Sequence, residues 1–422
     1  MIRGSVGTLI MVAWVLLAAA ALAQQADSKG ETKTPKIAAI VTAYYHNSHA
    51  DMLVSRLLQT TTLDGKGRRV QLQLASLYTD QVPDNDISRQ LSKKHGFPIY
   101  DNVADALTLG TGQLAVDGVL LIAEHGEYPE SETGQILYPK RRLFGEIVKV
   151  FEASDRVVPV FSDKHLSDNW QDAKWIYDTA DRMEIPMMAG SSLPVLWRYP
   201  ARDVRDSEPL EQIVAVSYHR LDTYGFHALE MVQTLAEARQ GGETGVKSVR
   251  CLEGDAVWKA AERGVFDRKL LDQALATLKE HPIKPGKPIE ARVKDPVLFV
   301  IDYRDGLRAN VLTLNGLVAE WAAAWKYKSG KTDAALFWTQ EWRPFQHFGH
   351  LLDGIEKMMH TGKPTWSVER TLLTTGVLDA LLISLKQGGK PLRTPQLHIE
   401  YRHDWRWTMP PPPPPNRPIQ GQ

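Results

Sequence analysis

Cysteine is nearly absent from the sequence. Cys251 is the only one among 422 residues, so the chain can form no internal disulfide and no cysteine-rich zinc site. Net charge is absent as well, because 50 Lys and Arg residues balance 50 Asp and Glu residues. Nucleic-acid binding needs a basic face that neutralises phosphates. The composition therefore argues against nucleic acid as the partner.

A long hydrophobic run is found only at the N-terminus. Leu9 to Leu22 is apolar, Arg3 precedes it, and the small residues Ala21 and Ala23 suit a cleavage site. The run is short for a membrane span, and a polar segment follows it. We predict a signal peptide over residues 1–23, export to the periplasm or the extracellular space, and no membrane attachment after cleavage. An uncleaved anchor is the alternative.

The C-terminus is rich in proline. Pro410 to Pro415 is an uninterrupted run of six prolines, which adopts polyproline II and has no backbone donors. We predict that residues 403–422 form a solvated tail outside the fold. The alternative is a ligand for a docking partner.

Between these ends, short apolar runs alternate with helical patterns. Strands are predicted near residues 37–43, 70–78, 97–100, 118–123, 157–161 and 185–189, with helices between them. Repeated β-α units predict an α/β fold with a doubly wound parallel sheet, over residues 36–200. The length leaves room for a second domain, which we place at residues 201–402.

Polar residues follow several of these strands. They are Tyr44, His46, Ser48 and His49 after the first, Glu124 and His125 after the fourth, and Asp163, Lys164 and His165 after the fifth. Ligands of doubly wound sheets bind beyond the carboxyl ends of the strands. We therefore expect these side chains to gather in one crevice.

Several segments resemble the Gfo/Idh/MocA oxidoreductases. Asp163-Lys164-His165, the helix after it and the strand ending at Gly190 are similar to the family's Glu-Lys-Pro segment. Asp222 to Glu230 resembles the segment that opens the first long helix of the family's second domain. The resemblance covers about residues 36–401. It implies a Rossmann-like first domain and an α+β second domain with an open, mostly antiparallel sheet.

The resemblance also implies oxidation or reduction of a sugar or polyol with NAD or NADP. Lys164 would orient and polarise the reacting hydroxyl, His227 would move its proton, and Asp222 is the third catalytic candidate. The nicotinamide would carry the hydride. Cofactor contacts are expected from Tyr44, His46, Ser48, His49, Asp80, Glu124, His125 and Asp163. An exposed sheet face on the second domain would suit a homo-oligomer.

The sequence departs from the family after the first strand. The family has a Gly-x-Gly-x-x-Gly turn there, whereas residues 43–50 contain no glycine, and Tyr44 and Tyr45 would crowd the phosphates. A second hypothesis therefore drops the nicotinamide: the crevice binds a carbohydrate-like ligand, with lyase or hydrolase chemistry or with binding alone. A divalent metal would then be held by Glu124, His125, Asp163, His165 and His227.

Lys164 is the most specific site prediction. We expect it in the crevice, where its replacement by alanine would leave folding nearly intact and weaken turnover or ligand affinity at least about tenfold. The alternative is a surface lysine paired with Asp168 or Asp172.

Overall fold

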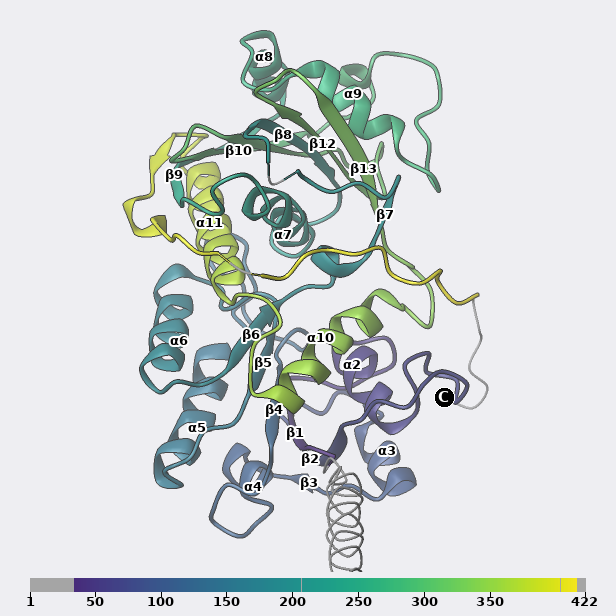
Figure 1. Ribbon diagram of the computed structural model, residues 1–422, viewed down its shortest axis with the longest axis vertical. Helices are drawn as coiled ribbons and strands as arrows, with labels where there is room; N and C mark the ends of the chain where they lie inside the picture. The colour runs from purple at the N-terminus through teal and green to yellow at the C-terminus, as the bar shows by residue number, and fades with distance from the viewer. Residues whose placement is uncertain (1–33, 206, 403, 416–422) are drawn as a thin grey trace, which may run out of the picture.

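The computed structural model describes residues 34–205, 207–402 and 404–415. The first sheet has six parallel strands in the order β3-β2-β1-β4-β5-β6 (Figure 1). Its strands are β1 (Lys36–Val41), β2 (Gln73–Thr79), β3 (Ile99–Tyr100), β4 (Gly118–Ile122), β5 (Val160–Asp163) and β6 (Met187–Gly190). The predicted signal peptide lies outside the described residues. Within them, no helix has the length and apolar character needed to cross a membrane.

Helices cover both faces of this sheet because its strands are apolar on both sides. In β1, Ile37, Ala39 and Val41 belong to one buried cluster, and Ala38 and Ile40 belong to the other. The first face carries α2 (His49–Leu58), α3 (Ser88–His95) and α10 (His347–Thr361), and the second carries α4 (Val103–Thr108), α5 (Lys140–Ala153) and α6 (Trp170–Arg182). The predicted doubly wound parallel sheet is confirmed.

Helix α10 comes from the C-terminal half of the chain but packs on the first sheet. Met359 of α10 lies so close to Gly118 of β4 that a Cβ at residue 118 would be 2.3 Å from the Met359 sulfur. Only glycine permits this approach without a shift of the methionine. The division into domains at 36–200 and 201–402 stays a prediction, and α10 packs across it.

The second sheet has eight strands in the order β14-β9-β10-β11-β8-β12-β13-β7. They are β7 (Trp197–Tyr199), β8 (Leu210–Ser217), β9 (Val246–Glu253), β10 (Val297–Tyr303), β11 (Arg308–Thr313), β12 (Trp321–Tyr327), β13 (Thr332–Trp338) and β14 (Leu392–Arg393). The β8–β11 pair is parallel, and the other pairs are antiparallel. The predicted open, mostly antiparallel second sheet is confirmed.

Helices pack on both faces of this second sheet. They are α7 (Tyr224–Glu237) and α11 (Glu369–Lys386) on the side of the first sheet, and α8 (Asp255–Glu262) and α9 (Arg268–Ala276) on the far side (Figure 1). Short 3₁₀ turns are η1 (Leu193–Val195), η2 (Ile289–Ala291) and η3 (Pro395–Leu397). Leu270, Leu271 and Ala274 of α9 are buried in the core of this sheet. Helix α9 therefore covers part of the face that was expected to be exposed, and homo-oligomer formation stays a prediction.

The C-terminal segment crosses the junction of the two sheets (Figure 1). Trp197 Nε1 donates to the carbonyl oxygen of Pro411 over 2.7 Å, and Gln340 Nε2 donates to that of Pro414 over 2.8 Å. Trp407 Nε1 donates to the carbonyl oxygen of Leu196 over 2.8 Å. Residues 404–415 therefore lie along the body of the protein, where buried side chains donate to two proline carbonyls, although none of these residues is itself buried. The solvated tail stays a prediction.

Deletion of residues 404–422 is expected to lower the free energy of unfolding by about 3 kcal/mol, because three hydrogen bonds of about 1 kcal/mol each are lost. Urea unfolding followed by tryptophan fluorescence measures this. Trp407→Phe is the matched control, since it removes one donor and keeps the ring, and it should cost about 1 kcal/mol. An unfolding curve unchanged by the deletion would show that the segment contributes nothing to stability.

Candidate functional site

A cavity of about 380 Å³ lies at the carboxyl ends of β4 and β5, against the start of α7. Residues of both sheets and their helices line it: Asn47, His49, Met52, Glu124, His125, Tyr138, Lys164, Ser192, Leu193, Thr223, Tyr224, His227, Trp321, Thr339, Glu341, Phe345, His347 and Phe348. We call it the central pocket. Its volume suits one small molecule. Of the predicted site residues, His49, Glu124, His125, Lys164 and His227 line it.

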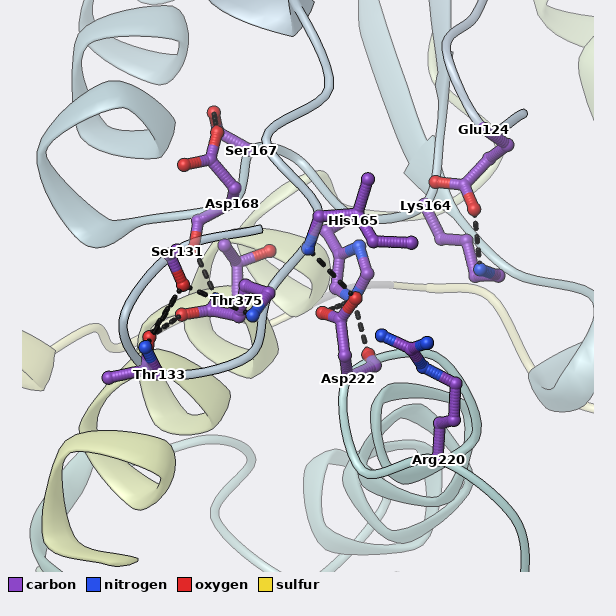
Figure 2. Close-up of polar contacts among 12 residues, drawn as sticks. Glu124, Ser131, Thr133, Lys164, His165, Ser167, Asp168, Arg220, Asp222 and Thr375 are labelled. Atoms are coloured by element: carbon purple, nitrogen blue, oxygen red, sulfur yellow. Dashed lines mark hydrogen bonds and ion pairs between the residues drawn. The ribbon is translucent and has the colours of Figure 1, made fainter. Parts of the chain in front are cut away.

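Lys164 and Glu124 form a buried ion pair at the carboxyl ends of β5 and β4 (Figure 2). The lysine Nζ is 2.7 Å from Glu124 Oε2, and Lys164 is only 2% exposed. Lys140, at the start of α5, contacts Glu124 Oε1 at 3.2 Å and also donates to the carbonyl oxygens of Asp163, Lys164 and His165. Lys140 thus fixes the turn after β5 that presents Lys164.

These contacts fix the charges of the pair. Burial raises the pKa of Glu124, but the charges of Lys164 and Lys140 outweigh it and hold that pKa well below its usual range. Burial lowers the pKa of Lys164, but attraction by Glu124 and Asp163 raises it above the usual value. The pocket therefore presents an ammonium group near neutral pH. The alternative of a surface lysine paired with Asp168 or Asp172 is wrong.

His49 and Asp163 form a second pair. His49 Nδ1 is 2.5 Å from Asp163 Oδ2, and Asp163 Oδ1 accepts from the backbone N–H of Lys164 over 3.0 Å. Asp163 is 1% exposed and binds the imidazole at Nδ1, while His49 lines the central pocket. A histidine held at Nδ1 by a carboxylate keeps Nε2 as its acceptor.

Four side chains that line the central pocket each have a buried nitrogen with no hydrogen-bond partner among the described residues. These nitrogens are His125 Nε2, His227 Nδ1, His347 Nδ1 and Trp321 Nε1. Burial lowers the pKa of His125 to about 3. Burial, and then the charges of Lys164 and Arg56 respectively, lowers the pKa values of His227 and His347 well below the usual value. These imidazoles are neutral near pH 7, and an unpartnered buried nitrogen is costly unless a ligand or water satisfies it.

Asp222 is not in the central pocket. His165 Nε2 is 2.7 Å from the Asp222 carbonyl oxygen and 3.6 Å from its carboxylate, whose other oxygen accepts from the backbone N–H of Ile136 over 3.2 Å (Figure 2). These contacts join the turn after β5 to the start of α7. Asp222 thus has a structural role in this turn, and its catalytic role stays a prediction.

Three predicted cofactor residues after β1 do not line the central pocket either. Tyr44 is fully buried in the core, with its hydroxyl 2.8 Å from Ser55 Oγ. Ser48 is the N-cap of α2 and accepts from the backbone N–H of Asp51. The His46 side chain is 48% exposed, and its nearest acidic group, Asp51, is 3.8 Å away. Tyr44 therefore serves core packing and Ser48 serves helix capping, although both were predicted to contact a cofactor.

The metal alternative is not supported, because most of its predicted ligands already pair with other groups of the chain. Glu124 is paired with two lysines, His165 with the Asp222 carbonyl, and His125 Nδ1 with the hydroxyl of Tyr45 at 2.9 Å. Within residues 34–205, 207–402 and 404–415, no three His, Cys, Asp or Glu side chains are arranged to hold a metal ion. The set Glu124, His125, Asp163, His165 and His227 is therefore corrected.

Sequence reasoning missed several pocket residues from outside the strand ends. Tyr138 precedes α5, Tyr224 begins α7 and Trp321 begins β12. Glu341 lies in the loop between β13 and α10, and His347 is the first residue of α10. Trp321 is only 3% exposed, yet it lines the pocket. Only tertiary packing brings the start of β12 and the residues after β4 to the same pocket.

No protein-family model and no curated protein matches the chain. Solved structures share its fold. A probable dehydrogenase from Thermotoga maritima aligns over 86% of this chain and 99% of its own, with a TM-score of 0.53 and 13% identity. Scyllo-inositol dehydrogenase from Lactobacillus casei, solved with NAD(H) and scyllo-inositol, aligns over 86% and 99%, with a TM-score of 0.51 and 11% identity.

GenD2 from gentamicin A biosynthesis, solved with NAD, aligns over 86% of this chain and 96% of its own, with a TM-score of 0.54 and 12% identity. At such identities the likeness establishes the fold alone. The chain therefore has the two-sheet fold of these dehydrogenases.

Proposed function

We propose that this chain is an enzyme that acts on a small sugar- or polyol-type molecule in the central pocket. The observation that carries the proposal is one cavity that holds a lysine ammonium and is lined by His125, His227, His347 and Trp321, each of which has a buried nitrogen without a partner among the described residues. A ligand with several hydroxyl groups supplies both donors and acceptors at once, which neutral imidazoles and an indole N–H require. Aromatic side chains such as Tyr224 and Phe348 supply apolar walls.

Lys164 and His227 have distinct roles in this proposal. The Lys164 ammonium donates to the reacting oxygen and stabilises negative charge on it. His227 is uncharged near pH 7, because burial holds its pKa well below the usual value, so it begins as a hydrogen-bond acceptor for a hydroxyl rather than as an acid. Glu124 keeps Lys164 charged and in place.

His227→Asn is expected to weaken binding of the best sugar or polyol at least about tenfold, which is about 1.4 kcal/mol. A thermal-shift screen of aldoses, ketoses, sugar acids and cyclitols finds the ligand, and calorimetry measures its affinity. His46→Asn is the control, because His46 is exposed and does not line the central pocket. Equal affinity of both variants for the ligand would remove His227 from the site.

The second candidate is an NAD- or NADP-dependent oxidoreductase acting on the same substrate class. It is favoured by the fold, since GenD2 and scyllo-inositol dehydrogenase were solved with NAD or NAD(H). A nicotinamide would take a hydride from the carbon whose oxygen Lys164 holds. This candidate requires that the crevice of the first sheet accept a dinucleotide.

A further inference from the structure

The start of α2 already carries an internal anion. In dinucleotide-binding α/β folds the pyrophosphate sits at the N-terminus of the helix after the first strand. Here Asp51, in the first turn of α2, is fully buried. Its carboxylate accepts from the backbone N–H of Asn47 over 2.9 Å, from Ser55 Oγ over 2.6 Å and from Arg343 Nη1 over 2.7 Å. A pyrophosphate would meet like charge at this position.

Asp80, another predicted cofactor contact, already has hydrogen-bond partners within the chain. Asp80 follows β2, and its carboxylate accepts from the hydroxyls of Tyr78 over 2.8 Å and Tyr128 over 2.7 Å, and from Arg142. Burial raises the pKa of Asp80, but these donors outweigh it and lower that pKa. Tyr128 comes from the segment after β4, so this segment covers the end of β2. A ribose diol would have to displace these donors.

The turn between β1 and α2 is also occupied by side chains. Tyr44 is buried in the core, and the Tyr45 hydroxyl is 2.9 Å from His125 Nδ1. His49, the first residue of α2, packs edge-on against His125 at 5.2 Å between ring centroids and against Phe348 at 4.9 Å. Side chains thus stand where a Gly-x-Gly-x-x-Gly turn leaves backbone open to phosphates. The residues present do not fit a dinucleotide.

From these contacts we infer that the chain works without a dinucleotide, as a redox-neutral proton-transfer enzyme on a sugar bearing a carbonyl group, with His49 as the base and Asp163 as its positioning residue. This rests on the proposed function of the central pocket and names its substrate class. Asp163 stabilises the imidazolium that forms on His49. No carboxylate within the described residues is hydrogen-bonded to His125 or His227.

The step balances without an oxidant. His49 Nε2 takes a proton from the carbon next to the carbonyl, and the electron pair of that C–H bond moves into an enediolate whose oxygen Lys164 stabilises. When the proton returns from His49 to the former carbonyl carbon, the hydroxyl proton of the enediolate passes to the other oxygen, and the carbonyl group moves to the adjacent carbon. When it returns to the same carbon, that carbon is restored or inverted. Product and substrate are isomers, so no hydride acceptor takes part.

Two measurements on the full chain test this inference. Calorimetric titration with NAD⁺, NADH, NADP⁺ and NADPH up to about 1 mM is expected to show no binding. Incubation with aldoses and ketoses in D₂O, without added cofactor, is expected to exchange the proton next to the carbonyl for deuterium, as followed by proton NMR.

Variants separate the roles. His49→Asn keeps a donor toward Asp163 but lacks the Nε2 base, so exchange should fall at least about a hundredfold. Asp163→Asn should lower the maximal exchange rate and leave the sugar concentration for half-maximal rate unchanged. His46→Asn is the matched control and should exchange at the wild-type rate.

The outcomes are distinguishable. Dinucleotide binding with a Kd below about 100 µM, or exchange that is absent or survives His49→Asn, would overturn the inference. If sugars bind in the pocket under these results, the proposed function stands without it. If no sugar or polyol binds at all, the proposed function fails as well.

Discussion

Replacing Lys164 with methionine is expected to lower the free energy of unfolding by about 3–5 kcal/mol, because it leaves the Glu124 carboxylate buried with one of its two cationic partners. This replaces the expectation from sequence that the position tolerates substitution, since Lys164 is 2% exposed rather than solvated. Urea unfolding measures the loss. Affinity for the pocket ligand should fall at least about tenfold in the same preparation.

A second variant separates stability from function. Lys164→Gln keeps an N–H donor toward Glu124 but has no ammonium, and Lys140 stays paired with the carboxylate. Stability should lie closer to the wild type than that of Lys164→Met, whereas ligand affinity should stay low because the ammonium is missing. A Lys164→Gln variant as unstable as Lys164→Met would show that the lost contact with Glu124 is not the cause of the loss.

Acid is expected to destabilise the protein through its buried histidines. The folded-state pKa is about 3 for His125 and well below the usual value for His227 and His347, whereas the unfolded value is about 6.5. Below pH 6.5 the unfolded chain binds protons that the folded chain does not. The contribution of each histidine is therefore complete above about pH 6.5 and is lost as pH falls, by about 1.5 kcal/mol between pH 6.5 and 5.

The triple variant with asparagine at these three positions isolates the effect. Buried Glu230 and Glu243, whose pKa values burial raises, act in the opposite direction in both proteins. The free energy of unfolding of the wild type should thus fall about 3–5 kcal/mol more than that of the variant between pH 6.5 and 5. Parallel pH profiles for the two proteins would contradict the neutral state of these histidines.

The first sheet could be predicted from sequence because its signals are local. Apolar runs such as Val119 to Ile122 are too short for helices, and Gly96 ends α3 in the left-handed conformation with a φ of 77°. Lys164 could be found because residues that follow a parallel strand face the crevice. These inferences need only strand direction and spacing.

Other parts depend on contacts between distant segments. Nothing near Ser48 or Asp80 in the sequence shows that α2 uses the first as its cap and that Tyr128 and Arg142 surround the second. His347 reaches the pocket only because α10 returns to the first sheet. The C-terminal prolines were assigned to solvent because their composition excludes strands and helices, but not the acceptance of hydrogen bonds by carbonyls.

The most direct measurement is a crystal structure of the protein with the sugar or polyol that raises its melting temperature most. The account predicts ligand density in the central pocket, with one oxygen within hydrogen-bond distance of Lys164 Nζ and hydroxyl groups at the unpartnered nitrogens of His227 and Trp321. Ligand bound elsewhere, with the central pocket filled only by water, would contradict it.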